Sequence, residues 1–183
     1  MNRRLAQGLD ADVAASHAAA TEAVIALGAN LGDRSQTLAA ALADLDRTPL
    51  TRVRVAADPI ETVALTPEGR DSSAPSYLNT VAIVETRLAP TVLLDYLHAI
   101  EERHGRAPRV AGAARWQDRT LDLDLIAYGD LRIDTPRLTV PHPRAADRDF
   151  VLLPWASIDP EAVLPGRGAV TDLIRALRPE GTE

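Results

Sequence analysis

The sequence predicts a single α+β domain with a ferredoxin-like core, in which an antiparallel sheet carries packed helices in the order β-α-β-β-α-β. A proline-rich C-terminal extension follows this core. Four segments are apolar or alternate between apolar and polar residues, which is typical of strands. Two further segments repeat apolar residues at helical spacing. A chain of 183 residues, 46% of them hydrophobic, suits one domain with a full core.

The first half of the core begins with a buried strand. Residues 23–28 form an apolar run that ends in glycine, and residues 28–33 follow as a turn. An amphipathic helix comes next, with apolar residues at i, i+3, i+4 and i+7: Leu38, Ala41, Leu42 and Leu45. A second strand is expected from about residue 51 into the 60s, because valines alternate with arginines there. The composition of residues 66–76 predicts a loop.

The second half repeats this order. Residues 78–86 are rich in β-branched residues and predict a third strand. Pro90 suits the first turn of a helix that ends at Gly105. Its buried stripe consists of Leu93, Leu94, Leu97 and Ile100. Residues 105–118 predict a second long loop, and residues 121–128 the fourth strand.

Prolines punctuate the remainder of the chain, which we expect to wrap round the core as a tail. They are Pro141, Pro143, Pro154, Pro160 and Pro165. One last short helix is expected, and its apolar residues are Val170, Leu173, Ile174 and Leu177. The domain is expected to span residues 22–183.

Two residue types are missing from the chain, and each absence excludes a class of chemistry. Without cysteine, disulfides, thiolate catalysis and zinc–sulfur sites are excluded. All 20 basic residues are arginine. A phosphate-binding P-loop and a Schiff-base lysine are therefore excluded as well. Any phosphate must be held by arginine, backbone amides and metal.

Charge and hydropathy disfavour nucleic acid as a partner and exclude a membrane-spanning helix. The formal net charge of −6 predicts no basic surface for nucleic acid. No run of 18 apolar residues could span a membrane. Residues 1–21 predict a flexible leader, because charged residues interrupt any signal-peptide core. The lack of cysteine fits a reducing cytoplasm, and a monomer is expected.

Residues 115–124, Arg-Trp-Gln-Asp-Arg-Thr-Leu-Asp-Leu-Asp, carry the strongest chemical signal. In a strand, Asp122 and Asp124 point to one face and the leucines between and beside them to the other. Parallel carboxylates repel, and a hard cation such as Mg²⁺ relieves that repulsion while keeping positions for phosphate. Arg115 and Arg119 offer planar forks for phosphate oxygens. The pattern predicts a magnesium–phosphate site.

A solvated edge strand, with its acids paired to its own arginines, would give the same Asp-Leu-Asp pattern. Short acidic pairs also occur in nucleotide-sugar glycosyltransferases. The neighbouring tryptophan disfavours the solvated strand, because exposing it without a partner is costly.

Taken together, the motifs resemble those of the 6-hydroxymethyl-7,8-dihydropterin pyrophosphokinase family. The resemblance runs from about residue 23 to residue 177. It is carried by Ala-Leu-Gly-Ala-Asn-Leu-Gly-Asp (26–33), Tyr-Leu-Asn-Thr (77–80), Ile-Glu-x-x-x-Gly-Arg (100–106), Arg-Trp-x-x-Arg-Thr-Leu-Asp-Leu-Asp (115–124), Thr-Val-Pro-His-Pro-Arg (139–144) and Arg-x-Phe (148–150). Each motif is weak alone, and their shared order and spacing are specific.

The resemblance implies transfer of pyrophosphate from ATP to the hydroxymethyl group of the pterin, giving AMP, in folate biosynthesis. It implies two Mg²⁺ ions held by Asp122 and Asp124, with Arg106 and Arg119 as catalytic arginines. The implied pterin contacts are Thr62, Leu65, Tyr77, Asn79 and Phe150, with the ring stacked between Tyr77 and Phe150. The implied ATP contacts are Glu101, Arg115, Trp116, His142 and Arg148.

Two other functions use the same features differently. A nucleotide-sugar glycosyltransferase would also use the acidic pair, although its usual Rossmann-like half is missing. A ferredoxin-like regulatory module would bind nucleotide without turning it over. The nucleotide product formed from Mg-ATP distinguishes the three.

Overall fold

The computed structural model describes residues 19–66, 69–71, 75–105 and 120–177. The expected leader and loop 105–118 lie almost entirely outside the described residues. Within them, no helix is long and apolar enough to cross a membrane.

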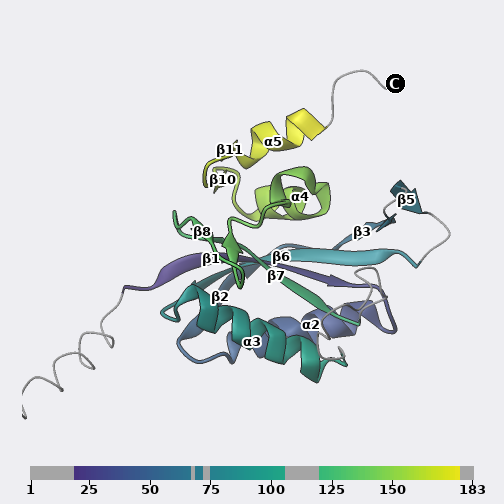
Figure 1. Ribbon diagram of the computed structural model, residues 1–183. Coiled ribbons are helices and arrows are strands. Elements are labelled where there is room, and N and C mark those ends of the chain that lie inside the picture. Colours follow the sequence, from purple (N-terminus) through teal and green to yellow (C-terminus); the bar gives the residue numbers. More distant parts are fainter. Residues whose placement is uncertain (1–18, 67–68, 72–74, 106–119, 178–183) are drawn as a thin grey trace, which may run out of the picture.

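A five-stranded antiparallel sheet forms the centre of the molecule (Figure 1). Its strands are β2 (Thr51–Ala56), β6 (Tyr77–Thr86), β1 (Thr21–Ala29) and β7 (Asp122–Tyr128), in that spatial order, with β3 (Ile60–Thr62) paired to β6. Every neighbouring pair is antiparallel. Helices cover both faces of the sheet (Figure 1). The predicted α+β class, an antiparallel sheet with helices packed on it, is confirmed.

Helices α2 (Arg34–Asp46) and α3 (Pro90–Arg103) cover one face. Asp33 begins α2, because its carboxylate accepts a hydrogen bond from the Gln36 backbone N–H at 2.9 Å. The apolar stripes predicted for both helices are buried against odd-numbered residues of β1 such as Ile25 and Leu27. These buried side chains form the larger core cluster, which removes apolar surface from water.

Helix α4 (Asp149–Ile158) covers the opposite face, and α5 (Val170–Leu177) packs against the outer side of α4 (Figure 1). A second core cluster lies there, built from the strand residues Val24, Val81 and Ile126 and from Val151 and Trp155. The prediction that residues after 140 form a tail with only one helix is therefore wrong, although α5 itself lies where it was expected. Pro154 stands inside α4 and removes one backbone donor, and burial of the helix between sheet and α5 offsets that loss.

Two boundaries differ from the prediction. The second strand is interrupted at residues 57–59, where Pro59 cannot donate to the ladder, so β2 and β3 pair separately with β6. Residues 66–76 are not a loop throughout, because β4 (Ala64–Thr66) pairs with β5 (Gly69–Asp71) in a short hairpin.

Five short elements also follow β7 in the described part of the chain. Strands β8 (Ile133–Asp134) and β9 (Thr139–Val140) pair with each other, and a 3₁₀ turn (Ala145–Asp147) leads into α4. Strands β10 (Val163–Leu164) and β11 (Gly168–Ala169) form a hairpin before α5. The segment between β9 and α4 reaches back to β7 from the α4 side.

Candidate active site

The two acids predicted to act together lie on β7 and share the face of the sheet that α4 covers further along. Asp122 and Asp124 are half-buried, whereas Leu123 and Leu125 are buried in the core on the α2–α3 side. The alternation expected for this strand is present in the structure. Both carboxylates therefore leave the sheet on the same side.

An arginine from the start of α4 meets the second acid. Arg148 Nη1 donates to Asp124 Oδ2 at 2.9 Å, and both side chains are largely buried, with 17% and 26% of their surface exposed. The Arg148 guanidinium also lies 5.5 Å from the centre of the Phe150 ring. Arg148 Nε is buried and has no hydrogen-bond partner among the described residues. Arg148 thus holds the acid through one nitrogen and keeps a second donor for another acceptor.

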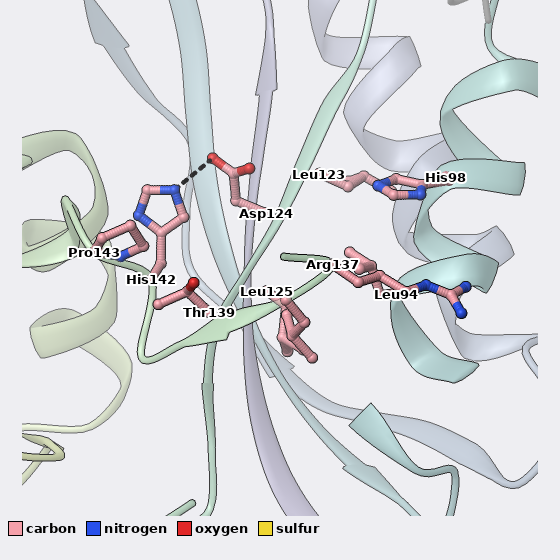
Figure 2. Close-up of a pocket in the computed structure, with 10 residues that line it drawn as sticks. Leu94, His98, Leu123, Asp124, Leu125, Arg137, Thr139, His142 and Pro143 are labelled. Atoms are coloured by element: carbon pink, nitrogen blue, oxygen red, sulfur yellow. Dashed lines mark ion pairs between the residues drawn. The ribbon is translucent and has the colours of Figure 1, made fainter. Parts of the chain in front are cut away.

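His142 approaches Asp124 from the segment after β9 (Figure 2). Its Nε2 lies 3.9 Å from Asp124 Oδ2. The Arg144 backbone N–H donates to His142 Nδ1 at 3.2 Å, so the neutral ring carries its proton on Nε2, on the side of the acid. Burial lowers the pKa of His142, against the raising effect of the Asp124 carboxylate. The ring is therefore neutral at pH 7.

A cavity of about 200 Å³ opens beside this group, between α3, β7 and the segment that follows β8. Its lining is Leu94, His98, Leu123, Asp124, Leu125, Arg137, Leu138, Thr139, His142 and Pro143 (Figure 2). Asp124 and His142 thus contribute to one wall, and apolar side chains to another. The sequence analysis did not name Arg137, assigned Leu94 to the buried stripe of a helix, and quoted the motif that contains Thr139.

Glu101 is not part of the cavity lining and contacts the backbone of β7. Its side chain is 1% exposed, and its Oε1 accepts a hydrogen bond from the Leu123 backbone N–H at 2.8 Å. This contact fixes the strand between the two acids. An ATP contact from Glu101, implied by the resemblance, stays a prediction.

Three residues predicted to bind the pterin lie at the start of β6 and on β3. Thr62 pairs with Tyr77 in the sheet, and Asn79 Nδ2 donates to Thr62 Oγ1 at 2.7 Å. Asn79 is 7% exposed, so this hydrogen bond satisfies a buried amide. Leu65 lies in β4, opposite Arg70.

Phe150 lies in the first turn of α4 and packs partly against the α4-side core cluster. This segment was expected to belong to the proline-rich tail, and that expectation is wrong because α4 begins at Asp149. Helix α4 contacts both β6 and β3, the strands that carry Tyr77 and Thr62.

Gly28 lies in the sheet between the residues predicted to bind the pterin and the two acids of β7. It is paired with Asn79 on one side and with Asp122 on the other, so the three residues form a row across β6, β1 and β7. A Cβ at position 28 would lie 2.7 Å from Asn79 Oδ1, closer than atoms can approach. Sequence reasoning assigned Gly28 to a turn, but it lies inside β1. A glycine within a strand pattern was the available signal, because it marks a close approach.

Four predicted site residues lie outside the described residues: Arg106, Arg115, Trp116 and Arg119. Helix α3, which ends before these residues, contacts β7, which begins after them. Their catalytic and ATP-binding roles stay predictions.

Comparison with known proteins identifies the family. The model of the family described as 7,8-dihydro-6-hydroxymethylpterin-pyrophosphokinase (HPPK) matches residues 24–160. A 2-amino-4-hydroxy-6-hydroxymethyldihydropteridine pyrophosphokinase from Pseudomonas aeruginosa is 40% identical over 159 residues, which cover 87% of this chain and 93% of the relative. The protein of that name from Haemophilus influenzae is 37% identical, with 84% and 91% covered.

Solved structures share the fold. A crystal structure of HPPK-DHPS in complex with substrates superposes with a TM-score of 0.67 at 13% identity, covering 87% of this chain and 43% of that one. Wild-type HPPK-DHPS from Plasmodium falciparum gives a TM-score of 0.65 at 12% identity, covering 90% and 42%. The chain therefore spans less than half the length of those proteins. From the family match and the relatives, which it covers almost end to end, the chain belongs to the 7,8-dihydro-6-hydroxymethylpterin-pyrophosphokinase family.

Proposed function

We propose that the reaction takes place on the α4 face of the sheet, above the row formed by Asn79, Gly28 and Asp122. The chain is a pyrophosphokinase of folate biosynthesis that acts on hydroxymethyldihydropterin, as its family membership shows. The row is the observation that carries the location. Neighbouring strands lie about 4.8 Å apart, so its two ends are separated by roughly 10 Å. Gly28 adds no side chain to the floor between them.

The pterin is proposed to bind at the β6 end of the row. Its ring would stack between Tyr77 and Phe150, which gains about 0.5–1.5 kcal/mol per ring pair beyond burial. Asn79, held by Thr62, would hydrogen-bond the polar edge of the ring, and Leu65 would contact it. The contact of α4 with β6 and β3 supports this arrangement.

ATP is proposed to bind at the β7 end. The cavity beside Asp124 and His142 supports a nucleotide there, since it combines apolar walls with a few polar groups. His142 and Arg148 would contact the phosphates. Arg106, Arg115, Trp116, Arg119 and Glu101 are the other proposed contacts of ATP or of the transferred group.

Two Mg²⁺ ions are proposed at Asp122 and Asp124. The donor set fits, because Mg²⁺ is usually bound by one or two carboxylates together with water and substrate phosphate. When bound, Mg²⁺ supplies the positive charge that lets a triphosphate approach two carboxylates. Arg148 would release Asp124 and turn its donors to a phosphate oxygen.

The chemistry needs alignment more than covalent help. The pterin hydroxymethyl oxygen would attack the β-phosphorus of ATP in line with the leaving oxygen. A new oxygen–phosphorus bond forms as the bond between the β-phosphorus and the bridging oxygen of AMP breaks. The alcohol proton is lost to solvent, and no dedicated base is proposed. Arginines would stabilise the charge that develops on the phosphoryl oxygens.

We also propose the finer description of the fold and its setting. The spatial order β2-β6-β1-β7, with helices between β1 and β2 and between β6 and β7, supports a ferredoxin-like core. The domain is proposed to span residues 22–183 and to act as a cytoplasmic monomer.

Identifying the nucleotide product tests the reaction. The protein is incubated with Mg-ATP and 6-hydroxymethyl-7,8-dihydropterin, and nucleotides are separated by chromatography. AMP formed in proportion to pterin diphosphate is the expected result. ADP would mean phosphoryl transfer, and unchanged ATP would mean binding without turnover, so either would contradict the proposal. As a control, Asp130→Ala, which removes an exposed carboxylate just beyond β7, should form the same products.

A further inference from the structure

Arg34, the first residue of α2, connects three separate segments through one nitrogen. Its Nη1 lies 2.9 Å from Glu61 Oε1 and 2.8 Å from both the backbone oxygen and the Oγ of Ser76. Ser76 Oγ in turn donates to Glu61 Oε1 at 2.6 Å. We call Arg34, Glu61 and Ser76 the Arg34 clamp.

The clamp lies directly before two proposed pterin contacts. Glu61 precedes Thr62, and Ser76 precedes Tyr77. Thr62 and Tyr77 face each other across β3 and β6, and Thr62 also holds Asn79. Strand β3 has only three residues, and among the strands that the structure describes it pairs with β6 alone. A strand this short makes few ladder hydrogen bonds, so an additional tether has a large influence on its position.

The energetics favour a positioning role over a general stabilising one. The Arg34 and Glu61 side chains are 30% and 59% exposed, and exposed ion pairs contribute little to folding. The hydrogen bond from Ser76, and next that from Arg34, lower the pKa of the Glu61 carboxyl, so it stays ionised throughout the neutral range. The network therefore keeps a fixed geometry at the ends of β3 and β6 without adding much to stability.

We infer that Arg34 is a positioning residue for the pterin pocket: through Glu61 and Ser76 it fixes the end of β3 against the start of β6, and with it the positions of Thr62 and Tyr77 at the pocket that accepts the ring. This inference rests on the proposed pterin site. Arg34 is not among the proposed substrate contacts, so its effect would pass through the residues beside it.

Substitution of Arg34 tests the clamp, with steady-state KM values for pterin and ATP and thermal unfolding as readouts. In Arg34→Ala we expect the pterin KM to rise about tenfold, while the ATP KM changes less than about twofold and Tm by less than about 4 °C. Arg34→Lys should recover most of the loss, because all three contacts come from one nitrogen and an ammonium carries three donors. Arg54→Ala is the matched control, since Arg54 pairs with Glu22 and Glu85 elsewhere on the sheet and is 53% exposed.

Three outcomes would overturn the inference, and Tyr77→Ala separates them. An unchanged pterin KM in Arg34→Ala, with a raised pterin KM in Tyr77→Ala, would leave the pterin site standing and remove the clamp. Equal losses for both substrates with a large fall in Tm would show that Arg34 supports the whole fold. An unchanged pterin KM in Tyr77→Ala would remove the proposed pterin site, and the clamp's role with it.

Discussion

The two ends of the active face differ in how they are built. At the pterin end the described polar contact is between neutral groups, and strand pairing fixes it: Asn79 and Thr62 meet because β3 and β6 are in register. At the nucleotide end, opposite charges from β7 and from the start of α4 neutralise each other, as Arg148 holds Asp124. The proposed pterin end is therefore preformed. At the proposed nucleotide end, Asp124 would have to exchange Arg148 for metal and phosphate.

Removing an acid should have the largest effect and should fall on the nucleotide end alone. We expect Asp124→Ala and Asp122→Ala to lower kcat by about 100-fold or more, because the charge of the triphosphate would no longer be balanced in the transition state. Pterin binding without ATP should remain within about twofold of the wild-type value. Rapid-quench turnover and fluorescence titration of the pterin measure the two effects.

Near-normal turnover in both variants would contradict the role proposed for the two acids. A loss of pterin binding as large as the loss of turnover would show that the two ends do not act separately. Asp130→Ala should leave both measurements unchanged.

Substitution of Glu101 tests whether its hydrogen bond with the Leu123 backbone fixes the position of β7. Glu101→Leu removes the acceptor of the buried Leu123 N–H, which should cost about 1–3 kcal/mol of stability and also lower kcat. Glu101→Gln keeps an amide oxygen in reach and should retain most of both. Urea unfolding and turnover measure the pair. A raised ATP KM in both variants at unchanged stability would instead support the direct ATP contact implied by the family resemblance.

Phe150 tests the pterin end. We expect Phe150→Ala to weaken pterin binding about tenfold, from lost stacking and burial, while ATP binding changes little. Calorimetric titration with each ligand separately measures the two affinities. Phe150→Leu, which keeps apolar volume in the first turn of α4, controls for loss of helix packing and should still bind pterin weakly. Equal weakening for both ligands would contradict the stacking role.

The smallest effect is expected far from both ends, at Asp44 on α2. A hydrogen bond with His104, and after it the charge of Arg103, lower the pKa of Asp44 below its ordinary 3.8 despite an opposing effect of burial. Its stabilising contribution is therefore complete above about pH 5 and is lost as the pH falls through the lowered pKa. The wild type should exceed Asp44→Asn in urea midpoint at pH 6 and lose that advantage near pH 3, with kcat equal at neutral pH. A difference that grows toward acid pH would reverse the assigned sign.

Sequence patterns predicted the α2–α3 side of the molecule well, because local periodicity decides those elements. Leu38 and Leu45 mark one helix stripe and Leu93 and Leu97 the other, and all four are buried. The α4 side was missed, since residues 149–158 are apolar on most sides and contain Pro154. Periodicity is weak in such a segment, and only tertiary packing makes it a helix.

In the candidate active site too, features set by local periodicity were predicted and features set by tertiary packing were not. The shared face of Asp122 and Asp124 follows from the two-residue period of a strand and was predicted. The contacts from Arg148 to Asp124 and from Glu101 to the Leu123 backbone join residues 24 and 22 positions apart, and no local pattern indicates them. Gly28 could have been found, because a glycine within an apolar strand indicates a close approach.

The most direct test of the central claim is a crystal soaked with Mn²⁺ and a non-hydrolysable ATP analogue, with anomalous scattering used to locate the metal. We predict two anomalous peaks within bonding distance of the Asp122 and Asp124 carboxylates, with Arg148 moved from Asp124 to a phosphate oxygen. Bound nucleotide without a peak at these acids, and with Arg148 still paired to Asp124, would contradict the proposed site.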